Sequence, residues 1–366
     1  MKKPKFLKTS YLKQEIREFL IKILFLFNYF EEHYKNSEKS LLISSTDGMG
    51  DAVVRQKLLD MIVEKEAKIY DNIYILASKN SYEFFKIFGY NVILRSDDER
   101  TKLIKRIKLI KKLTNLNIEK VIHLEFDIQD EFIRYLKCKE KIGFNNIYHP
   151  ETNKLLTQVI KMGDKYVLED CVSFANEYFD KTFKLEELKP DLEKKMKNEN
   201  SNYNIVIGVG ANSKTRIIDI KRTKEYIDKI YELYPKKQIT LIGKGELEFK
   251  ISKKLEIEFP KLKNFVNKLS LEETIDEIQN SDLYIGYDSG LYNLAFGFNK
   301  KIICFFGGNK KTRFYHNKFN EVEILSYIEV SKPCNIIKNS DYGTYELNNI
   351  SVENFEVSLI KLMNRS

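Results

Sequence analysis

The most constraining feature of the sequence is a stretch toward its C-terminal end, residues 281–308, in which two apolar runs flank a helical segment. Residues 283–287 and 302–306 are short apolar runs bounded by polar residues, a pattern typical of buried strands. Between them, residues 291–298 carry apolar side chains at helical spacing. Strand, helix and strand in this order predict a βαβ unit, and therefore a parallel sheet in an α/β fold.

The turn between the first strand and the helix consists of Asp288, Ser289 and Gly290. Such a turn lies at the carboxyl edge of a parallel sheet, where open α/β sheets bind ligands. The free N–H groups and positive dipole end of the helix favour a phosphate there, and Gly290 has no side chain to block its approach. Taken alone, however, the turn favours the simpler interpretation that Asp288 or Ser289 caps the helix.

Taken whole, the stretch resembles glycosyltransferase family 9, the bacterial heptosyltransferase family of lipopolysaccharide synthesis. The C-terminal motif of that family is an apolar strand, Asp-Ser/Thr-Gly, a short helix, and a second strand that ends in Phe-Gly. The matching residues are Asp288, Ser289, Gly290, Leu294, Ala295, Phe306 and Gly307. One position departs from the motif, because Asn293 stands where the family usually has His.

A second glycine-rich turn lies near the N-terminus, between a predicted strand at 41–45 and a predicted helix at 51–66. It reads Asp-Gly-Met-Gly-Asp and fails the dinucleotide-binding pattern G-x-G-x-x-G, because Val53 occupies the third glycine position. The turn resembles the opening segment of the same family, in which the Asp after the glycine is the proposed catalytic base. The resemblance maps this role to Asp51 and places Gly48 and Gly50 beside the acceptor.

A carboxylate suits this role, since an inverting glycosyl transfer needs a base beside the acceptor hydroxyl as it attacks the anomeric carbon. Two alternatives remain open. Asp51 could be an ordinary acidic residue in the first turn of a helix, stabilised by the helix dipole. Asp47, in the same turn, is the local rival for the catalytic role.

The remaining chain alternates between short apolar runs and amphipathic segments. Further strands are expected at 72–77, 91–94, 120–126, 141–144, 204–209, 238–242 and 262–266. Further helices are expected at 81–88, 101–113, 130–138, 164–183, 224–233, 271–279 and 352–363. Strands that alternate with helices predict parallel sheets covered on both faces.

The predicted strand at 204–209 is followed by a basic, glycine-containing turn that suits the diphosphate of a nucleotide-sugar donor. This segment also resembles the start of the family's nucleotide domain, although the usual Trp-Pro is missing, so the register of the basic residues is open. The predicted donor-binding residues of the turn are Asn212, Ser213, Lys214 and Arg216, with Lys221 as an alternative cation. The next turn of this kind contains Gly243 and an acidic residue for a ribose hydroxyl, a role for which Glu246 and Glu248 compete.

The resemblance implies a GT-B-like α/β fold, with two Rossmann-type parallel-sheet domains facing a central cleft. The expected parts are an N-terminal amphipathic helix at 1–40, an acceptor-side domain at 41–190, a linker at 191–203, a nucleotide-sugar-binding domain at 204–345 and a C-terminal helix at 346–366. The linker is expected because the chain before residue 204 is polar and has almost no apolar periodicity.

The N-terminal region differs from the rest of the chain in its hydrophobic pattern. Residues 11–34 read as one helix with a dense apolar centre that is too short to span a bilayer. No small-residue cleavage site follows it, which argues against a signal peptide. Either the helix lies in a membrane interface, so that residues 1–34 contact the membrane surface, or it packs on the protein's own surface.

The amino-acid composition limits the classes of binding partner that this chain is expected to have. The chain has 62 Lys and Arg against 53 Asp and Glu, and its net charge of +9 favours acidic partners such as nucleotide diphosphates or anionic lipids. Nucleic acid is disfavoured as a partner, because no arginine-rich tract or RNA-binding motif is present. The four cysteines, Cys138, Cys171, Cys304 and Cys334, form no C-x-x-C pair and read as buried or free thiols.

Several catalytic motifs are missing from the sequence. It has no Walker A motif, no G-x-S-x-G elbow, no H-E-x-x-H and no Asp-x-Asp beside a predicted strand. His123 and His149 have no partner at metal-ligand spacing and are interpreted as structural. We therefore expect no metal and no cofactor, with cationic side chains and helix N-termini stabilising the leaving group.

Together these features predict an inverting, metal-independent glycosyltransferase that acts in the cytoplasm or peripherally on the inner face of the cytoplasmic membrane. By family analogy the donor is ADP-heptose, and the acceptor is a lipopolysaccharide or lipooligosaccharide core or a related cell-surface glycan. One alternative is a family member that uses another nucleotide sugar, carrying a hexose or an N-acetylhexosamine. The other is a non-catalytic homologue that binds nucleotide sugars.

Overall fold

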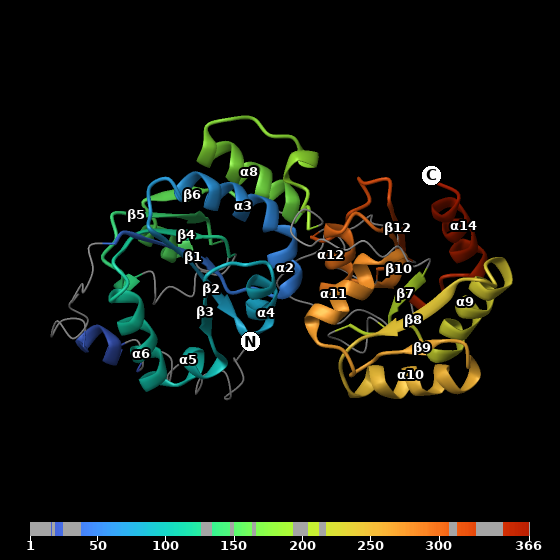
Figure 1. Ribbon diagram of the computed structural model, residues 1–366. Coiled ribbons are helices and arrows are strands. Elements are labelled where there is room, and N and C mark those ends of the chain that lie inside the picture. The colour runs from blue at the N-terminus through green and yellow to red at the C-terminus, as the bar shows by residue number, and fades with distance from the viewer. Residues whose placement is uncertain are drawn as a thin grey trace, which may run out of the picture. The chain divides into compact units, whose positions relative to one another are not determined.

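The chain divides into two compact units, each built on one six-stranded parallel sheet (Figure 1). The structure is a computed structural model that describes residues 16, 19–24, 38–125, 134–146, 150–162, 166–192, 204–211, 217–306, 313–326 and 347–365. Unit 1 comprises Met1–Gly48, Leu58–Met162 and Ser173–Lys181, and unit 2 comprises Met49–Lys57, Gly163–Val172 and Thr182–Ser366. Residues 49–57 and 163–172, which the sequence assigned to the first domain, therefore cluster with unit 2.

Unit 1 contains the sheet with strand order β3-β2-β1-β4-β5-β6. Its strands are β1 (Ser40–Ser45), β2 (Asn72–Ser78), β3 (Val92–Arg95), β4 (Ile118–His123), β5 (Glu140–Phe144) and β6 (Gln158–Ile160). Its helices include α4 (Lys79–Ile87), α5 (Asp97–Thr101), α6 (Leu103–Thr114) and a 3-10 turn at Pro150–Leu155. Most of α3 (Gln56–Glu66) and the second half of α8 (Val167–Phe179) also belong to this unit.

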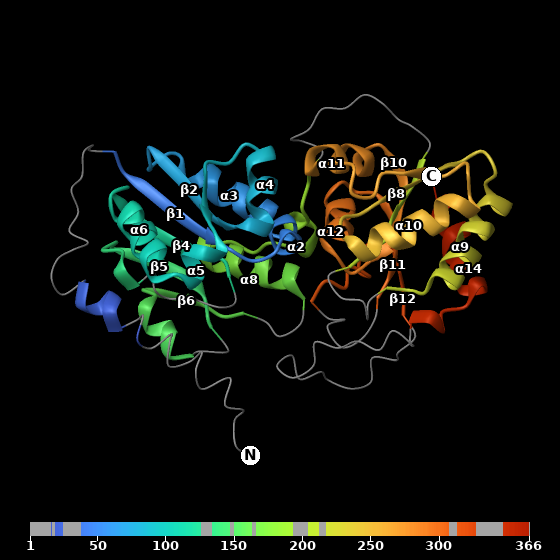
Figure 2. The ribbon, with the colours of Figure 1, turned by 90° about the horizontal axis from the view of Figure 1, so that it is seen from below.

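Unit 2 contains the sheet with strand order β12-β11-β10-β7-β8-β9 (Figure 2). Its strands are β7 (Asn204–Gly208), β8 (Gln238–Ile242), β9 (Lys263–Asn264), β10 (Ser281–Tyr287), β11 (Lys301–Phe305) and β12 (Val322–Leu325). Its helices are α2 (Met49–Val54), α9 (Ile220–Leu233), α10 (Glu246–Glu258), α11 (Leu271–Gln279), α12 (Gly290–Gly297) and α14 (Val352–Met363), with a 3-10 turn at Leu185–Leu188.

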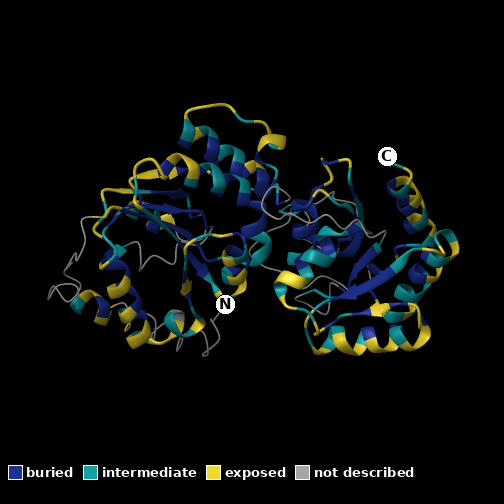
Figure 3. Cartoon of the chain, viewed as in Figure 1, coloured by how far each residue is buried: buried dark blue, intermediate teal, exposed yellow. Residues whose placement is uncertain are grey.

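The central strands are buried because helices cover both faces of each sheet, as the dark strands between partly yellow helices show (Figure 3). All six residues of β1 are buried, and the apolar side chains of β10 and β11 pack in the core of unit 2. Burial on both faces explains why the centres of these strands are continuous apolar runs, such as Leu41–Ile43 and Ile302–Phe305, instead of alternating. The predicted α/β class with parallel sheets is confirmed.

In each sheet the strand order reverses at one point. This point lies between β1 and β4 in unit 1 and between β7 and β10 in unit 2. In open α/β sheets, ligands bind beyond the carboxyl ends of the strands at such a switch point. The segments that follow these four strands are therefore the places where functional side chains are expected. The two motif-bearing turns, after β1 and after β10, are among them.

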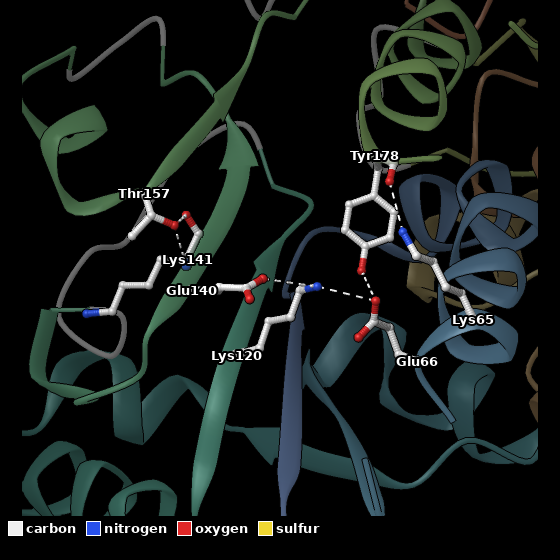
Figure 4. Close-up of polar contacts among 7 residues, drawn as sticks. All are labelled: Lys65, Glu66, Lys120, Glu140, Lys141, Thr157 and Tyr178. Carbon is white, nitrogen blue, oxygen red and sulfur yellow. Dashed lines mark hydrogen bonds and ion pairs between the residues drawn. The ribbon is translucent and has the colours of Figure 1, made fainter. Parts of the chain in front are cut away.

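An ion-pair network around the buried Glu66 side chain links two helices to the amino-terminal end of the unit 1 sheet (Figure 4). The Glu66 carboxylate, at the end of α3, accepts a hydrogen bond from the Tyr178 hydroxyl of α8. The ammonium group of Lys120, in β4, lies 3.3 Å from Glu66 and 3.3 Å from Glu140 of β5. Since Lys120 and Glu140 lie in the amino-terminal halves of their strands, this network is distant from the ligand edge and stabilises the fold.

Several elements differ from the sequence prediction. The helix predicted at 51–66 is divided into α2 and α3 at Arg55. Strands β6 and β12 were missed because they are short edge strands with few buried side chains. Helix α10 was missed because its buried residues are only Ser252 and Leu255, which gives almost no apolar stripe.

Some predictions concern residues that the structure describes only in part. The linker predicted at 191–203 lies largely outside the described residues, as does Cys334. Of the helix predicted at 130–138, residues 134–138 are described, and only 134 and 135 are helical. Cys138, Cys171 and Cys304 take part in no disulfide among the described residues, and the last two are buried. Of the predicted N-terminal helix, residues 19–24 are described and helical, and Ile21 is buried in the same cluster as Leu109 and Leu113 of α6. Among the described residues, no helix is long and apolar enough to cross a membrane.

Candidate active site

The two motif-bearing helix ends meet within unit 2, where α2 packs against α12. A Cβ atom added to Gly50 would lie 2.8 Å from Nδ2 of Asn293, and one added to Gly290 would lie 2.5 Å from Cε of Met49. Both contacts are closer than real Cβ atoms allow, so glycine permits this approach. The structure thus brings together Gly50–Asp51 and the Asp288–Gly290 turn, which are far apart in the sequence.

Asp51 lies in the first turn of α2 and is paired with two arginines. Nη2 of Arg313 lies 2.5 Å from Oδ1 of Asp51, and Nη2 of Arg55 lies 3.7 Å from the same oxygen. The Asp51 side chain is only 18% exposed, and burial by itself raises its pKa. The positive charges of Arg313 and Arg55 outweigh burial and hold the pKa of Asp51 below its ordinary value, so the carboxylate is ionised at neutral pH.

The closest contact of both arginines is to Oδ1, which leaves Oδ2 as the better placed oxygen to accept a proton. An ordinary acidic residue in the first turn of a helix would not be paired with two arginines, as Asp51 is. The rival Asp47 uses its backbone carbonyl, which accepts a hydrogen bond of 2.9 Å from the Ser78 hydroxyl. Sequence reasoning missed Arg313 entirely; Arg55 could have been noticed, because it stands four residues after Asp51 on one helical face.

The Asp288–Gly290 turn does not behave as a simple helix cap. Ser289 is the N-cap residue of α12 and has extended backbone dihedral angles, but its side chain makes no capping hydrogen bond. Instead, its carbonyl oxygen accepts a hydrogen bond of 2.9 Å from Nδ2 of Asn293. Asp288 is buried at the end of β10. The Ser289 hydroxyl oxygen is buried beside the Tyr284 hydroxyl, so the first N–H groups of α12 lack a side-chain cap from Ser289.

Asn293, the residue that replaces the family's usual His, lies at the centre of a buried hydrogen-bond chain. Its Oδ1 atom lies 3.0 Å from Nε2 of His316, and Nδ1 of His316 lies 2.7 Å from the Tyr166 hydroxyl. The His316 ring is fully buried and stacks on Phe296 at 3.8 Å between ring centroids. No local sequence pattern indicates this cluster, because its members come from three separate segments of unit 2.

A third ligand-edge feature lies at the turn after β8. Gly243 and Gly245 have positive φ angles of 153° and 145°, which favour glycine. The Glu248 side chain lies directly against Gly245 and Gly210, so a Cβ atom on either glycine would collide with it. Glu246 points away, since it is exposed and forms an ion pair of 2.5 Å with Lys250. Of the two competing acidic residues, Glu248 is the one that lies at the ligand edge.

Most of the basic turn after β7 lies outside the described residues. The predicted donor-binding residues Asn212, Ser213, Lys214 and Arg216 lie outside the described residues, as does Gly307. Lys221, the alternative cation, lies in the first turn of α9. Gly48, predicted to lie beside the acceptor, immediately precedes α2.

In unit 1, a buried carboxylate fixes the turn that follows β1. Glu125, just after β4, accepts hydrogen bonds of 2.6 Å from the Ser44 hydroxyl, the Thr46 amide and the Thr46 hydroxyl. Burial raises its pKa, but the nearby charges of His123 and Arg95 and these hydrogen bonds hold the pKa below its ordinary value. His123, interpreted as structural, lies at the ligand edge of this sheet, with its Nε2 atom 3.9 Å from the Glu125 carboxylate.

The described residues contain no group of three or more His, Cys, Asp or Glu that could hold a metal ion. The polar groups at the two switch points are instead cations, hydroxyls, amides and single carboxylates. Such groups can bind phosphates and accept or donate protons.

Comparison with known proteins places this arrangement in a family. A model of glycosyltransferase family 9 (heptosyltransferase) matches residues 106–341. The chain belongs to glycosyltransferase family 9. It is also 25% identical over 284 residues to lipopolysaccharide heptosyltransferase 1 of Campylobacter coli, a match that covers 71% of this chain and 80% of that protein.

Solved structures of the family share the fold. The glycosyltransferase family 9 protein of Veillonella parvula has a TM-score of 0.68 at 12% identity, covering 91% of this chain and 100% of its own. E. coli heptosyltransferase WaaC, solved with ADP-2-deoxy-2-fluoro heptose, has a TM-score of 0.66 at 14% identity, covering 87% of this chain and 98% of its own. These similarities confirm the predicted GT-B fold, and family membership confirms that the chain is a glycosyltransferase.

Proposed function

We propose that this glycosyltransferase moves heptose from ADP-heptose onto a lipopolysaccharide or lipooligosaccharide core, or a related cell-surface glycan, with inversion at the anomeric carbon. The observation that supports the proposal is the packing of the Asp51 helix against the Ser289–Gly290 helix end. In the proposed roles, this packing would hold a base close to a phosphate site. The heptose donor is supported by the Campylobacter coli relative, which is a lipopolysaccharide heptosyltransferase, and by the heptose analogue bound to E. coli WaaC.

In the proposed reaction, an acceptor hydroxyl attacks the anomeric carbon of the donor in one displacement. The new glycosidic C–O bond forms as the bond between the anomeric carbon and the diphosphate oxygen breaks, and ADP leaves. Asp51 accepts the hydroxyl proton through Oδ2, the oxygen that its arginine partners contact less closely. Gly48 is proposed to leave room for the acceptor beside this carboxylate, whereas the side-chain position of Gly50 is taken up by Asn293 of α12.

The leaving diphosphate would be stabilised by fixed protein groups. The N–H groups at the start of α12, with Ser289 and Gly290, supply a positive dipole end and hydrogen-bond donors. Lys214 and Arg216, with Asn212 and Ser213, are proposed to add positive charge and donors from the turn after β7. This donor set can replace a divalent cation, so we propose that transfer is independent of added metal.

The nucleoside would lie along the turns after β7 and β8. Glu248 is proposed as the acidic residue that accepts hydrogen bonds from the ribose hydroxyls, because it lies between Gly210 and Gly245. Glu246 competes with Glu248 for this role in the sequence, but the Glu246 side chain is engaged by Lys250 at the surface. Gly243 allows close approach of the nucleotide to the backbone.

The acceptor is proposed to be lipid-linked, which places the reaction at the inner face of the cytoplasmic membrane. The N-terminal region supports a surface contact, since Phe19 is 62% exposed while Ile21 is buried against unit 1. An exposed aromatic residue on a helix beside basic α6 suits a membrane interface.

A second candidate, a transferase that uses another nucleotide sugar, is favoured by one observation. Asn293 stands where the family usually has His, so the surroundings of the transferred sugar differ from the family pattern. The two candidates predict different donors but the same base and the same single displacement.

Thermal stabilisation and transfer assays separate these candidates. The purified protein is heated with ADP, UDP, GDP or CMP without added metal, because a ligand that binds the folded state raises the melting temperature. A shift with ADP alone, together with transfer from ADP-heptose in the presence of EDTA, is the expected result. A shift with UDP or GDP instead of ADP would replace heptose by another sugar.

A further inference from the structure

The Arg313–Asp51 contact joins two segments that are 262 residues apart in the sequence. The Arg313 side chain is 29% exposed, and a pair at that exposure ordinarily contributes little to stability. The Arg313–Asp51 pair matters for function, because Asp51 is the carboxylate proposed to take the acceptor proton. A guanidinium group on that carboxylate controls both its orientation and its charge.

The segment that carries Arg313 is anchored on both sides. The Arg313 carbonyl accepts a hydrogen bond of 3.0 Å from the backbone N–H of Val167, at the start of α8. One residue later, the Phe314 carbonyl accepts a hydrogen bond of 3.1 Å from the Tyr292 hydroxyl of α12. That hydroxyl in turn accepts a hydrogen bond of 3.3 Å from the backbone N–H of His316. The backbone around Arg313 is thus tied to two helices.

The His316 side chain adds a third anchor with a defined direction. Nδ2 of Asn293 donates to the Ser289 carbonyl, so its Oδ1 must accept a hydrogen from Nε2 of His316. Nδ1 of His316 then carries no hydrogen and accepts from the Tyr166 hydroxyl. Burial and the charge of Lys189 lower the pKa of His316 well below its ordinary value, which keeps this neutral tautomer. The chain runs from Tyr166 to the phosphate turn at Ser289.

We propose that Arg313 is a positioning residue for the transfer reaction, fixed by the Tyr166–His316–Asn293 hydrogen-bond chain, and that it holds the Asp51 carboxylate with Oδ2 directed to the acceptor hydroxyl. This proposal rests on the proposed function, in which Asp51 is the base. It explains why the hydrogen-bond chain links the Arg313 segment to α12, since the same chain orients the base and the phosphate turn together.

The charged groups around Asp51 set the expected pH dependence. Arg55 approaches at the end of α2 and Arg313 from the segment after β11, while α8 contributes Cys171, whose pKa burial raises to about 12. The neighbouring α12 contributes the uncharged Gly290 and Asn293. Burial raises the pKa of Asp51 and the two arginines lower it. Without Arg313, Arg55 and a backbone hydrogen bond still oppose burial, but the charge and the hydrogen bond of Arg313 are lost, so the pKa of Asp51 rises.

The test is a pH–rate profile of kcat/KM for transfer by Arg313→Met, Arg313→Lys and Lys318→Met. Lys318 is the matched control, because it lies in the same segment and pairs with Glu169 of α8 instead of Asp51. Arg313→Met is expected to lower kcat/KM by about 100-fold, as for other losses of positioning, and to move the acid limb to higher pH. Arg313→Lys keeps the charge and should keep the acid limb. Lys318→Met should match the unmodified enzyme.

Three results would overturn the proposal: an unchanged profile in Arg313→Met, a uniform loss at all pH values without movement of the acid limb, or an equal movement in Arg313→Lys. ADP-induced stabilisation of each variant verifies that it is folded. Should Arg313→Met not fold, Tyr166→Phe removes only the first donor of the chain, and a smaller shift in the same direction is expected; no shift contradicts the proposal.

Asp51→Asn separates this inference from the proposed function. If Asp51→Asn retains the full rate, the assignment of the base fails. If Asp51→Asn is inactive while Arg313→Met behaves like the unmodified enzyme, the role of Asp51 stands and only the role of Arg313 fails.

Discussion

His316 and Asn293 form a buried hydrogen bond of 3.0 Å, which brings an imidazole to the first turns of α12 from a segment 23 residues away. Asn293 is the position at which this chain departs from the family motif, where His is usual. The departure is therefore accompanied by an imidazole from elsewhere in the chain. Asn293 also contacts Gly50, so the residue connects the helix of the proposed base to the helix of the phosphate turn.

Restoring the family residue should be harmful in this context. Asn293→His is expected to lower the free energy of unfolding by about 1–3 kcal/mol, because a larger side chain must fit against His316 and the Gly50 backbone. Urea denaturation measures the effect. Asn354→His, at an exposed position of α14, is the control and should leave the midpoint unchanged. An Asn293→His variant as stable as the unmodified protein would show that the contact between α2 and α12 can accommodate the larger side chain.

Glu248 and Glu246 should differ sharply in nucleotide binding. Glu248→Gln is expected to weaken ADP binding about 10-fold or more, since a charged hydrogen-bond acceptor for the ribose is lost. Glu246→Gln should bind ADP normally, because that carboxylate is exposed and paired with Lys250. Isothermal titration calorimetry gives both dissociation constants. Equal effects of the two substitutions would refute the assignment of the ribose to Glu248.

The network around Glu66 predicts a large stability effect far from the proposed active site. Lys120→Met should destabilise the protein by about 3 kcal/mol, because it leaves the Glu66 carboxylate buried without its cation. Lys105→Met removes an exposed partner of Asp98 and should leave the unfolding midpoint unchanged. Urea unfolding of the two variants makes the comparison. Similar midpoints would mean that the Tyr178 hydrogen bond alone satisfies Glu66.

Glu125 should contribute to the acid sensitivity of the fold. Its pKa in the folded state is held below the ordinary value of 4.5, so its contribution to stability is complete above that value. The contribution is lost as pH falls through the lowered folded-state pKa, because the unfolded chain binds the proton first. Glu125→Gln should therefore show a flatter fall of the urea midpoint below pH 4.5, whereas Glu83→Gln, exposed on α4, should follow the unmodified protein. An equally steep fall in Glu125→Gln would contradict this account.

The sequence predicted the features that depend on local pattern. Buried parallel strands are continuous apolar runs, so β1, β7 and β10 could be located to within a few residues. The Gly50–Asp51 and Asp288–Gly290 turns could be recognised because glycine and acidic residues follow those strands directly. Their meeting does not follow from this pattern, because β1 and β10 belong to different sheets.

The contacts that complete the site could not be predicted, because they depend on tertiary packing. Arg313, His316 and Tyr166 have no local pattern that distinguishes them from surface or core residues. The choice between Glu246 and Glu248 depends on helical phase, since two residues of α10 that are two positions apart point in different directions. The edge strands β6 and β12 were missed because edges bury little apolar surface.

The most direct measurement is the transfer rate of Asp51→Asn with ADP-heptose and a lipopolysaccharide-core acceptor. The account predicts a loss of at least about 100-fold in kcat, since general-base catalysis is removed, while ADP still raises the melting temperature of the variant. An Asp51→Asn enzyme that is folded, binds ADP and transfers heptose at the full rate would contradict the central claim.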